Sequence, residues 1–196
     1  MSSCQCEQYS GESTVRQILM DEHRVIERVL DAVERMVNDG CFDRSFLVKA
    51  LDFFRNFADG CHHAKEEGEL FPELERAGLP RDGGPIGCML HEHDEGRGYI
   101  RAIQSNLDSA GRGDRSALAE VARAARQYVV MLRQHIQKED NVLFVLAENM
   151  LLPQQKEKIL KGFASKENEP QSTGQRGRYL KLAEELERWD FQKTCI

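Results

Sequence analysis

The sequence lacks an excess of positive charge, a long apolar run and any CxxC pair of cysteines. Its 27 lysine and arginine residues are outnumbered by 33 aspartate and glutamate residues, giving a formal net charge of −6. A protein that follows a phosphate backbone needs a basic surface, so we expect no nucleic-acid partner. No apolar run approaches the roughly 20 residues that span a bilayer, and the segment MSSCQCEQYSGE at the start lacks the basic and apolar regions of a secretory signal. These absences predict a cytoplasmic protein that binds no membrane.

The six cysteines include no CxxC pair and are too few for a disulfide scaffold, so we expect most of them to be reduced thiols. Cys61 and Cys88 fall inside helical patterns and are expected to be small core or flank residues. The spacing of Cys4 and Cys6 leaves metal binding or oxidation open as their role.

What the sequence does contain is 40% hydrophobic residues, arranged almost everywhere at helical spacing. The first apolar pattern begins at Val15 and the second runs from Phe46 to Leu74. The third starts at Pro85, and the fourth follows Asp114 as far as Met150. Four long amphipathic helices with short connections predict an all-α fold, an up-down-up-down four-helix bundle.

The chain divides into a flexible N-terminus, the bundle and a C-terminal extension, at residues 1–12, 13–152 and 153–196. In the extension we expect a short helix after Pro153, a linker from Ser165 to Gly177 and a docking helix from Tyr179 to Phe191. The only tryptophan, Trp189, is expected to anchor this helix on the bundle or on a second subunit of a homodimer.

Polar side chains interrupt the apolar stripe of every predicted helix. Each of these residues lies three, four or seven positions from apolar neighbours and is therefore expected to face inward. They are four histidines and two glutamates: His23, His62, Glu66, His93, His135 and Glu139.

The two halves of the chain repeat this arrangement. Residues 19–23 resemble residues 89–93, and the pattern His62-xxx-Glu66-xxx-Leu70-Phe71 returns as His135-xxx-Glu139-xxx-Leu143-Phe144. The repeat predicts a site with pseudo-twofold symmetry.

Buried ionised carboxylates each cost several kcal/mol unless something neutralises them. Hydrogen-bonded His–Glu pairs are one solution, and a metal centre is the one that we favour. Six mixed nitrogen and oxygen ligands exceed the four that zinc prefers, and imidazole suits neither calcium nor magnesium. Iron or manganese fits better, with Glu66 and Glu139 as bridges between two ions.

Two pairs of neighbouring histidines require a choice. On an α-helix His62 and His63 are about 100° apart, so we expect His62 to face inward and His63 to lie outward with Asn56 and Asp59. A pairing of His63 with Glu67 stays open. His91 and His93 differ by about 200°, and His93 is the one expected to face the centre.

The chain resembles the hemerythrin-like, HHE cation-binding family over roughly Val15 to Met150. The resemblance rests on four motifs, Asp21 to Arg24, His62 to Pro72, Glu92 to Arg97 and His135 to Glu139. It implies two non-haem iron ions joined by an oxo or hydroxo bridge, with manganese or zinc as substitutes. The implied ligands are His23, His62, Glu66, His93, His135 and Glu139.

This chain departs from the oxygen-carrying members of the family, which take a fifth histidine from the third helix. The residues four positions from His93 are Met89 and Arg97, so we expect less saturated irons that are open to O2, NO or peroxide. The resemblance is closer to proteins linked with nitric oxide, oxidative stress and repair of iron–sulfur centres.

Three functions remain open. The preferred one is a di-iron protein that binds or reduces a small oxidant. The electrons for a reduction would come from an unidentified donor. The alternatives are an O2 or iron sensor whose metal state alters docking of the tail, and an iron storage or donation protein. Tyr128, two turns before His135, is read as a core residue rather than as a hydrogen-bond or electron donor to the centre.

Overall fold

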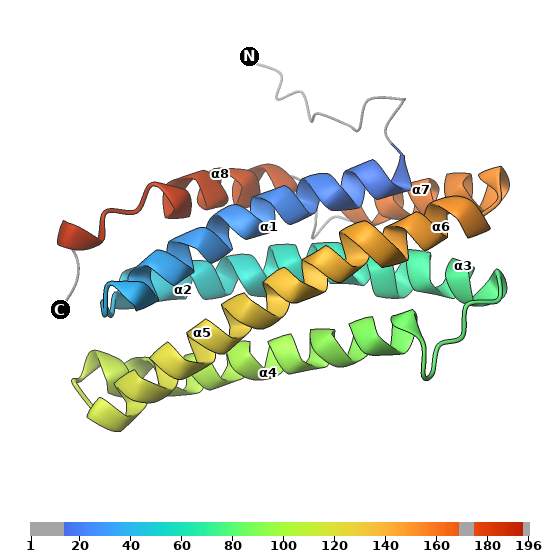
Figure 1. Cartoon of the computed structure of the whole chain (residues 1–196). Helices are drawn as coiled ribbons and strands as arrows, with labels where there is room; N and C mark the ends of the chain where they lie inside the picture. The colour runs from blue at the N-terminus through green and yellow to red at the C-terminus, as the bar shows by residue number, and fades with distance from the viewer. Residues whose placement is uncertain (1–13, 169–174, 194–196) are drawn as a thin grey trace, which may run out of the picture.

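Throughout the residues that the computed structural model describes, 14–168 and 175–193, all regular structure is helical. The four predicted apolar patterns each form one long helical stretch. In chain order the stretches are α1 (Val15–Asn38); α2 (Arg44–Phe53), η1 (Phe54–His63), η2 (Glu66–Leu70) and α3 (Phe71–Arg76); α4 (Pro85–Gly111); and α5 (Arg115–Lys138), η3 (Glu139–Leu143) and α6 (Phe144–Met150). The segments η1, η2 and η3 are π-helical. Successive stretches lie side by side and run in opposite directions (Figure 1).

The helices begin where side chains satisfy the free backbone N–H groups of the first turn. The Thr14 side chain accepts a hydrogen bond from the Gln17 backbone, Asp43 caps α2, and Asp114 caps α5 in the same way. Pro85 is the first residue of α4, where its missing N–H costs nothing. These caps fix the start of each stretch and therefore the depth at which its polar residues lie.

The apolar core is divided into two clusters by a layer of polar residues. In α1, Ile18 and Leu19 belong to one cluster and the residues from Ile26 onward belong to the other. The same division occurs between Ala58 and Leu70 in the second stretch. All four stretches therefore carry a buried histidine at one level of the molecule, between the two clusters.

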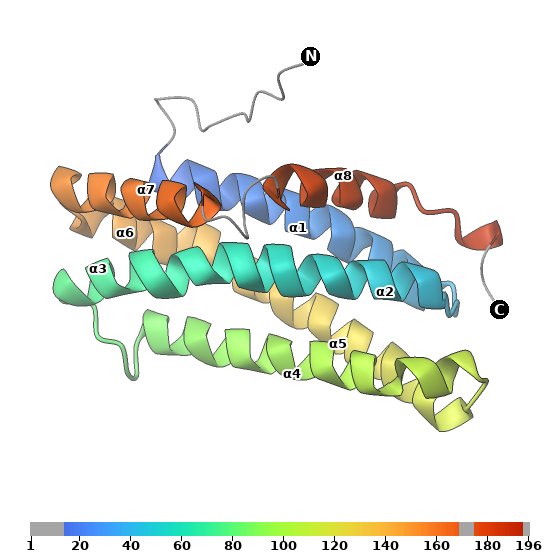
Figure 2. The ribbon, with the colours of Figure 1, turned by 180° about the vertical axis from the view of Figure 1, so that it is seen from behind.

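Two further helices, α7 (Pro153–Asn168) and α8 (Gln175–Glu187), lie along the outer side of α1 and the α2–α3 stretch (Figure 2). The short 3₁₀ segment η4 (Phe191–Lys193) follows α8. The expected linker is therefore wrong at both ends, because residues 165–168 continue α7 and residues 175–177 begin α8. The remaining residues of that segment, 169–174, lie outside the described residues.

The C-terminal helix packs on this same chain. Tyr179 and Leu186 are buried, and the Trp189 Nε1 group donates a hydrogen bond to Asp43 Oδ2 at 2.8 Å. The Trp189 ring also meets Phe46 edge-on. The tryptophan thus anchors the tail at the start of α2.

Cys61 and Cys88 are free thiols and Cys41 is disulfide-bonded, whereas Cys4 and Cys6 lie outside the described residues, as does the expected flexible N-terminus. No helix in the described part of the chain is both long enough and apolar enough to cross a bilayer.

Candidate metal centre

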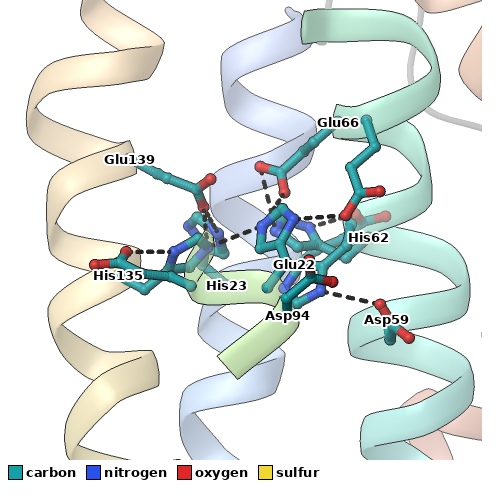
Figure 3. A network of polar contacts seen from close by, with 12 residues as sticks. Glu22, His23, Asp59, His62, Glu66, Asp94, His135 and Glu139 are labelled. Atoms are coloured by element: carbon teal, nitrogen blue, oxygen red, sulfur yellow. Dashed lines mark hydrogen bonds and ion pairs between the residues drawn. The ribbon is translucent and has the colours of Figure 1, made fainter. Parts of the chain in front are cut away.

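The polar layer brings together all six residues singled out by the sequence. Their side chains are at most 1% exposed and come from all four long stretches (Figure 3). The potential ligand atoms of the histidines, Glu66 and Glu139 gather in two groups, within each of which they lie no more than 4.8 Å apart. One group holds His23, His62, Glu66 and Glu139; the other holds His63, Glu66, His93 and His135.

Each of the four predicted histidines points one ring nitrogen at a carboxylate outside these groups. The Nδ1 atoms of His23 and His93 lie 2.7 Å from Asp140 and Glu67, respectively. Those of His62 and His135 lie 3.0 Å from Glu22 and Glu92. An ionised carboxylate only accepts hydrogen bonds, so each Nδ1 carries a proton, and the Nε2 atom of each ring, when the ring is neutral, directs its lone pair at the centre.

The carboxylates that orient the histidines occupy equivalent positions in the two halves of the pseudo-twofold repeat. Glu22 and Glu92 directly precede an inward histidine, and Glu67 and Asp140 directly follow an inward glutamate. A lysine completes the pattern, because Lys65 pairs with Glu22 as Lys138 pairs with Glu92. The repeat therefore extends beyond the predicted ligands to the groups that hold them in place, and these were missed from the sequence.

Six of the inward atoms have no hydrogen-bond partners. The Nε2 atoms of His23 and His62 and both carboxylate oxygens of Glu66 and Glu139 are buried without one. Some of them come within 3.2 to 3.6 Å of each other, as His23 Nε2 does of Glu139, but without hydrogen-bond geometry. Buried polar atoms are normally satisfied, so this set requires a further partner.

The ring pair of His93 and His135 leads to the same conclusion. Their Nε2 atoms face each other at 3.2 Å. Since both Nδ1 atoms are committed to carboxylates, the contact needs a proton on one of the two Nε2 atoms. Burial lowers the pKa of His135, but Glu139 and Glu92 outweigh it and raise this pKa to about 9, so the charged His135 ring supplies that proton. A metal ion bound to both Nε2 atoms would replace the proton, as in other metal sites where carboxylates orient the ligating histidines. The donor set thus fits metal ions.

The pKa values of Glu66 and Glu139 are shifted in opposite directions. Burial and the neighbouring Glu139 raise the pKa of Glu66 well above its ordinary value. Burial acts in the same direction on Glu139, but His135 and His23 outweigh it and hold the pKa of Glu139 well below its ordinary value. Cations placed between the two groups favour the ionised form of both carboxylates.

His63 differs from the sequence expectation. It is 6% exposed rather than outward-facing, and its ring stacks on His93 with centroids 3.8 Å apart. Its Nδ1 atom lies 3.3 Å from Asp59 instead of pairing with Glu67. The reason is the π-helical geometry of η1, in which the Ala64 N–H reaches back to the Asp59 carbonyl and the α-helical step of 100° no longer applies.

The other choices among neighbours agree with the structure. His91 is exposed and His93 is buried. Arg97 stays outside the centre and forms ion pairs with Asp59 and Glu67. The centre therefore contains a fifth imidazole, but it comes from the second stretch rather than from α4.

A model of the hemerythrin HHE cation-binding domain matches residues 14–147, which include the whole polar layer. The chain belongs to the hemerythrin family. The resemblance seen in the four motifs is thus confirmed, and α7 and α8 lie beyond the matched residues.

Several curated proteins are similar to this hemerythrin-family chain. Uncharacterized protein Rv1995 of Mycobacterium tuberculosis is 29% identical over 136 residues, which are 67% of this chain and 52% of that protein. The iron-sulfur cluster repair protein YtfE of Dickeya chrysanthemi is 32% identical over 85 residues, which are 42% of this chain and 38% of YtfE. YtfE of Edwardsiella ictaluri is 34% identical over 101 residues, 50% and 45% of the two chains. The chain spans about half the length of these relatives, and no solved structure matches it.

Proposed function

We propose that this chain is a non-haem di-iron protein that binds or reduces a small oxidant, O2, NO or peroxide, in a stress response or in the protection of iron centres. The proposal treats the four long stretches as an up-down-up-down four-helix bundle built around the paired site. Membership of the hemerythrin family and the similarity to proteins named for iron–sulfur cluster repair support it.

One observation carries the proposal: buried imidazole nitrogens of His23 and His62 and the carboxylate oxygens of Glu66 and Glu139 converge without hydrogen-bond partners. The Nδ1 atom of each predicted histidine is meanwhile held by a carboxylate. His23, His62 and Glu139 would hold one ion, and His63, His93 and His135 the other, with Glu66 shared between the two groups. Glu139 also lies 3.2 Å from His135 and so can reach both groups. Iron bound there would supply the redox chemistry.

The protein's own groups fix the ligand side chains in place and exclude water from the centre. The carboxylates fix the histidine rings so that little reorganisation is needed when the charge at the centre changes. The apolar clusters on both sides of the layer limit water, which strengthens electrostatic interactions within it. A small oxidant would therefore meet a preorganised site.

The test is purification without oxygen, followed by metal analysis and by titration of the reduced protein with NO or O2. We expect two irons per chain and optical changes on addition of either gas. His135→Ala should lose most of the iron, whereas the exposed His91→Ala should retain it. Absence of bound iron, or inertness of the loaded protein toward NO, O2 and peroxide alike, contradicts the proposal.

A sensor function is the second candidate, and a specific set of contacts favours it. Glu167 in α7 lies 2.6 Å from Lys65, which lies 2.6 Å from Glu22, which in turn holds His62. A change at the centre could thus alter the docking of α7. Protease cleavage of α7 and α8 that is identical with and without iron rules out this candidate.

A further inference from the structure

A cavity of about 280 Å³ reaches the metal layer from one side, between η1, α4 and α5. Its inner residues are buried and include His63 and His93 of the second ligand group. Its outer residues Arg55, Arg101 and Gln104 are exposed. The cavity therefore leads from the surface to the candidate centre.

The cavity is much larger than a small oxidant needs. One water molecule takes up about 30 Å³ in the liquid, and O2 or NO is of similar size. The volume instead approaches the lower end of the range for organic-ligand pockets, about 300 Å³. The size points to an organic molecule of several carbon atoms.

The walls are apolar in the interior and carry one unused polar group. Phe54, Ile100, Met131 and Leu132 line the cavity together with Tyr128, which is 4% exposed. The Tyr128 hydroxyl makes no hydrogen bond to the described residues and is not among their fully buried unpartnered atoms, so the cavity can reach it. A ligand that accepts a hydrogen bond would satisfy it.

Two arginines at the mouth lack the carboxylate partners that their neighbours have. Arg97 pairs with Asp59, Glu67 and Asp94, and Glu92 pairs with Lys138 and His135. Arg55 only hydrogen-bonds Gln104, at 3.1 Å, and no carboxylate in the described part of the chain pairs with Arg55 or Arg101. Two guanidinium groups at the rim of an apolar cavity favour an anion with an apolar body.

We propose that this cavity binds a small organic anion, with its charged end at Arg55 and Arg101 and its apolar body along Phe54, Ile100 and Met131. The inner end then lies against His63 and His93. Only this last placement, next to a reactive centre, rests on the proposed function; binding of the anion does not. The site would admit a medium-chain carboxylate of about ten heavy atoms.

The experiment uses octanoate as the probe and the methyl resonances of methionine as the readout, in the full chain with and without iron. We expect a saturable shift of the Met131 methyl signal, assigned from Met131→Leu, and no shift for Met150 at the end of α6. Arg101→Ala and Arg55→Ala should each weaken binding about tenfold, the loss expected for a hydrogen bond to a charged group. The exposed Arg115→Ala, which does not line the cavity, should bind normally.

A second variant fills the cavity. A Cβ atom on Gly96 would lie 3.0 Å from the Met131 methyl and 3.4 Å from the Tyr128 ring, so Gly96→Leu must occupy the space near both. We expect this variant to lose octanoate binding while it keeps its helical circular dichroism and its iron. If Gly96→Leu does not fold, the arginine variants still decide the question.

Three results would overturn the proposal: no saturable shift at millimolar octanoate, equal affinity for uncharged octanol, or normal binding by both arginine variants. Octanoate binding to a protein that takes up no iron would instead keep the cavity as an anion site and reject the di-iron function. Iron uptake without octanoate binding would keep the di-iron function and reject the anion site.

Discussion

Lys65 Nζ lies 2.6 Å from Glu22 Oε1, and neither side chain has any exposed surface. Glu22 in turn accepts a hydrogen bond from His62 Nδ1 at 3.0 Å. Burial would raise the pKa of Glu22, but Lys65 and His62 outweigh it and lower this pKa to about 2. The buried lysine thus keeps the carboxylate ionised and able to orient a candidate metal ligand.

Replacement of Lys65 by methionine should therefore be strongly destabilising. Removal of one partner of a buried ion pair weakens the compensation of the other charge and typically costs about 3 to 5 kcal/mol. The matched control is Lys138→Met, since Lys138 holds the equivalent position in the repeat but its side chain is 41% exposed. Exposed pairs contribute about 0 to 1 kcal/mol.

Urea denaturation of the metal-free proteins measures both variants under the same conditions. The expected order of stability is wild type, then Lys138→Met close below it, then Lys65→Met. Equal losses in the two variants would show that the burial of Lys65 has no special energetic role.

Glu73 predicts a pH dependence in the docking of α7. This carboxylate contacts Lys158 and Gln155 of α7, and these contacts, with that of Arg76, lower its pKa in the folded protein. A group whose pKa is lower when folded contributes stability above its unfolded pKa, about 4.3 for glutamate, and loses the contribution as the pH falls.

We therefore expect Glu73→Gln to be less stable than wild type at pH 7, with the difference shrinking as the pH falls below about 4. Thermal unfolding followed across this pH range measures it. Glu157→Gln, which removes an exposed pair with Lys161 on α7 itself, is the control and should change little at any pH. A difference that widens toward acid would contradict the assignment.

His63 separates the structure from the sequence expectation. Because its ring lies in the second ligand group, His63→Ala should weaken iron retention against a chelator by about 10- to 100-fold, the range for loss of a group that supports a metal site. The exposed His91→Ala should leave retention unchanged. Equal retention in the two variants would show that the buried His63 ring is not a metal ligand.

Helical periodicity located the four long stretches and the six inward residues because both depend on local spacing, which the sequence carries directly. It failed at His63 because the extra residue in each turn of η1 depends on packing and not on the residue pattern. It also missed Lys65, whose partners Glu22 and Glu167 are 43 and 102 residues away. A lysine reads as exposed until such distant contacts are known.

The pseudo-twofold repeat makes a final prediction about the carboxylates that orient the histidines. Asp140 and Glu67 hold His23 and His93 at the same distance, 2.7 Å, so Asp140→Asn and Glu67→Gln should weaken metal binding to a similar extent, about 10- to 100-fold. Competition with a chelator during iron loading measures both. Asp94→Asn is the control, because Asp94 is exposed and, within the described residues, forms an ion pair with Arg97 and none with a histidine. An amide of nearly the same size preserves the shape of the site but supplies no charge. If either orienting variant binds iron as tightly as Asp94→Asn does, packing alone holds the histidine that the replaced carboxylate contacts.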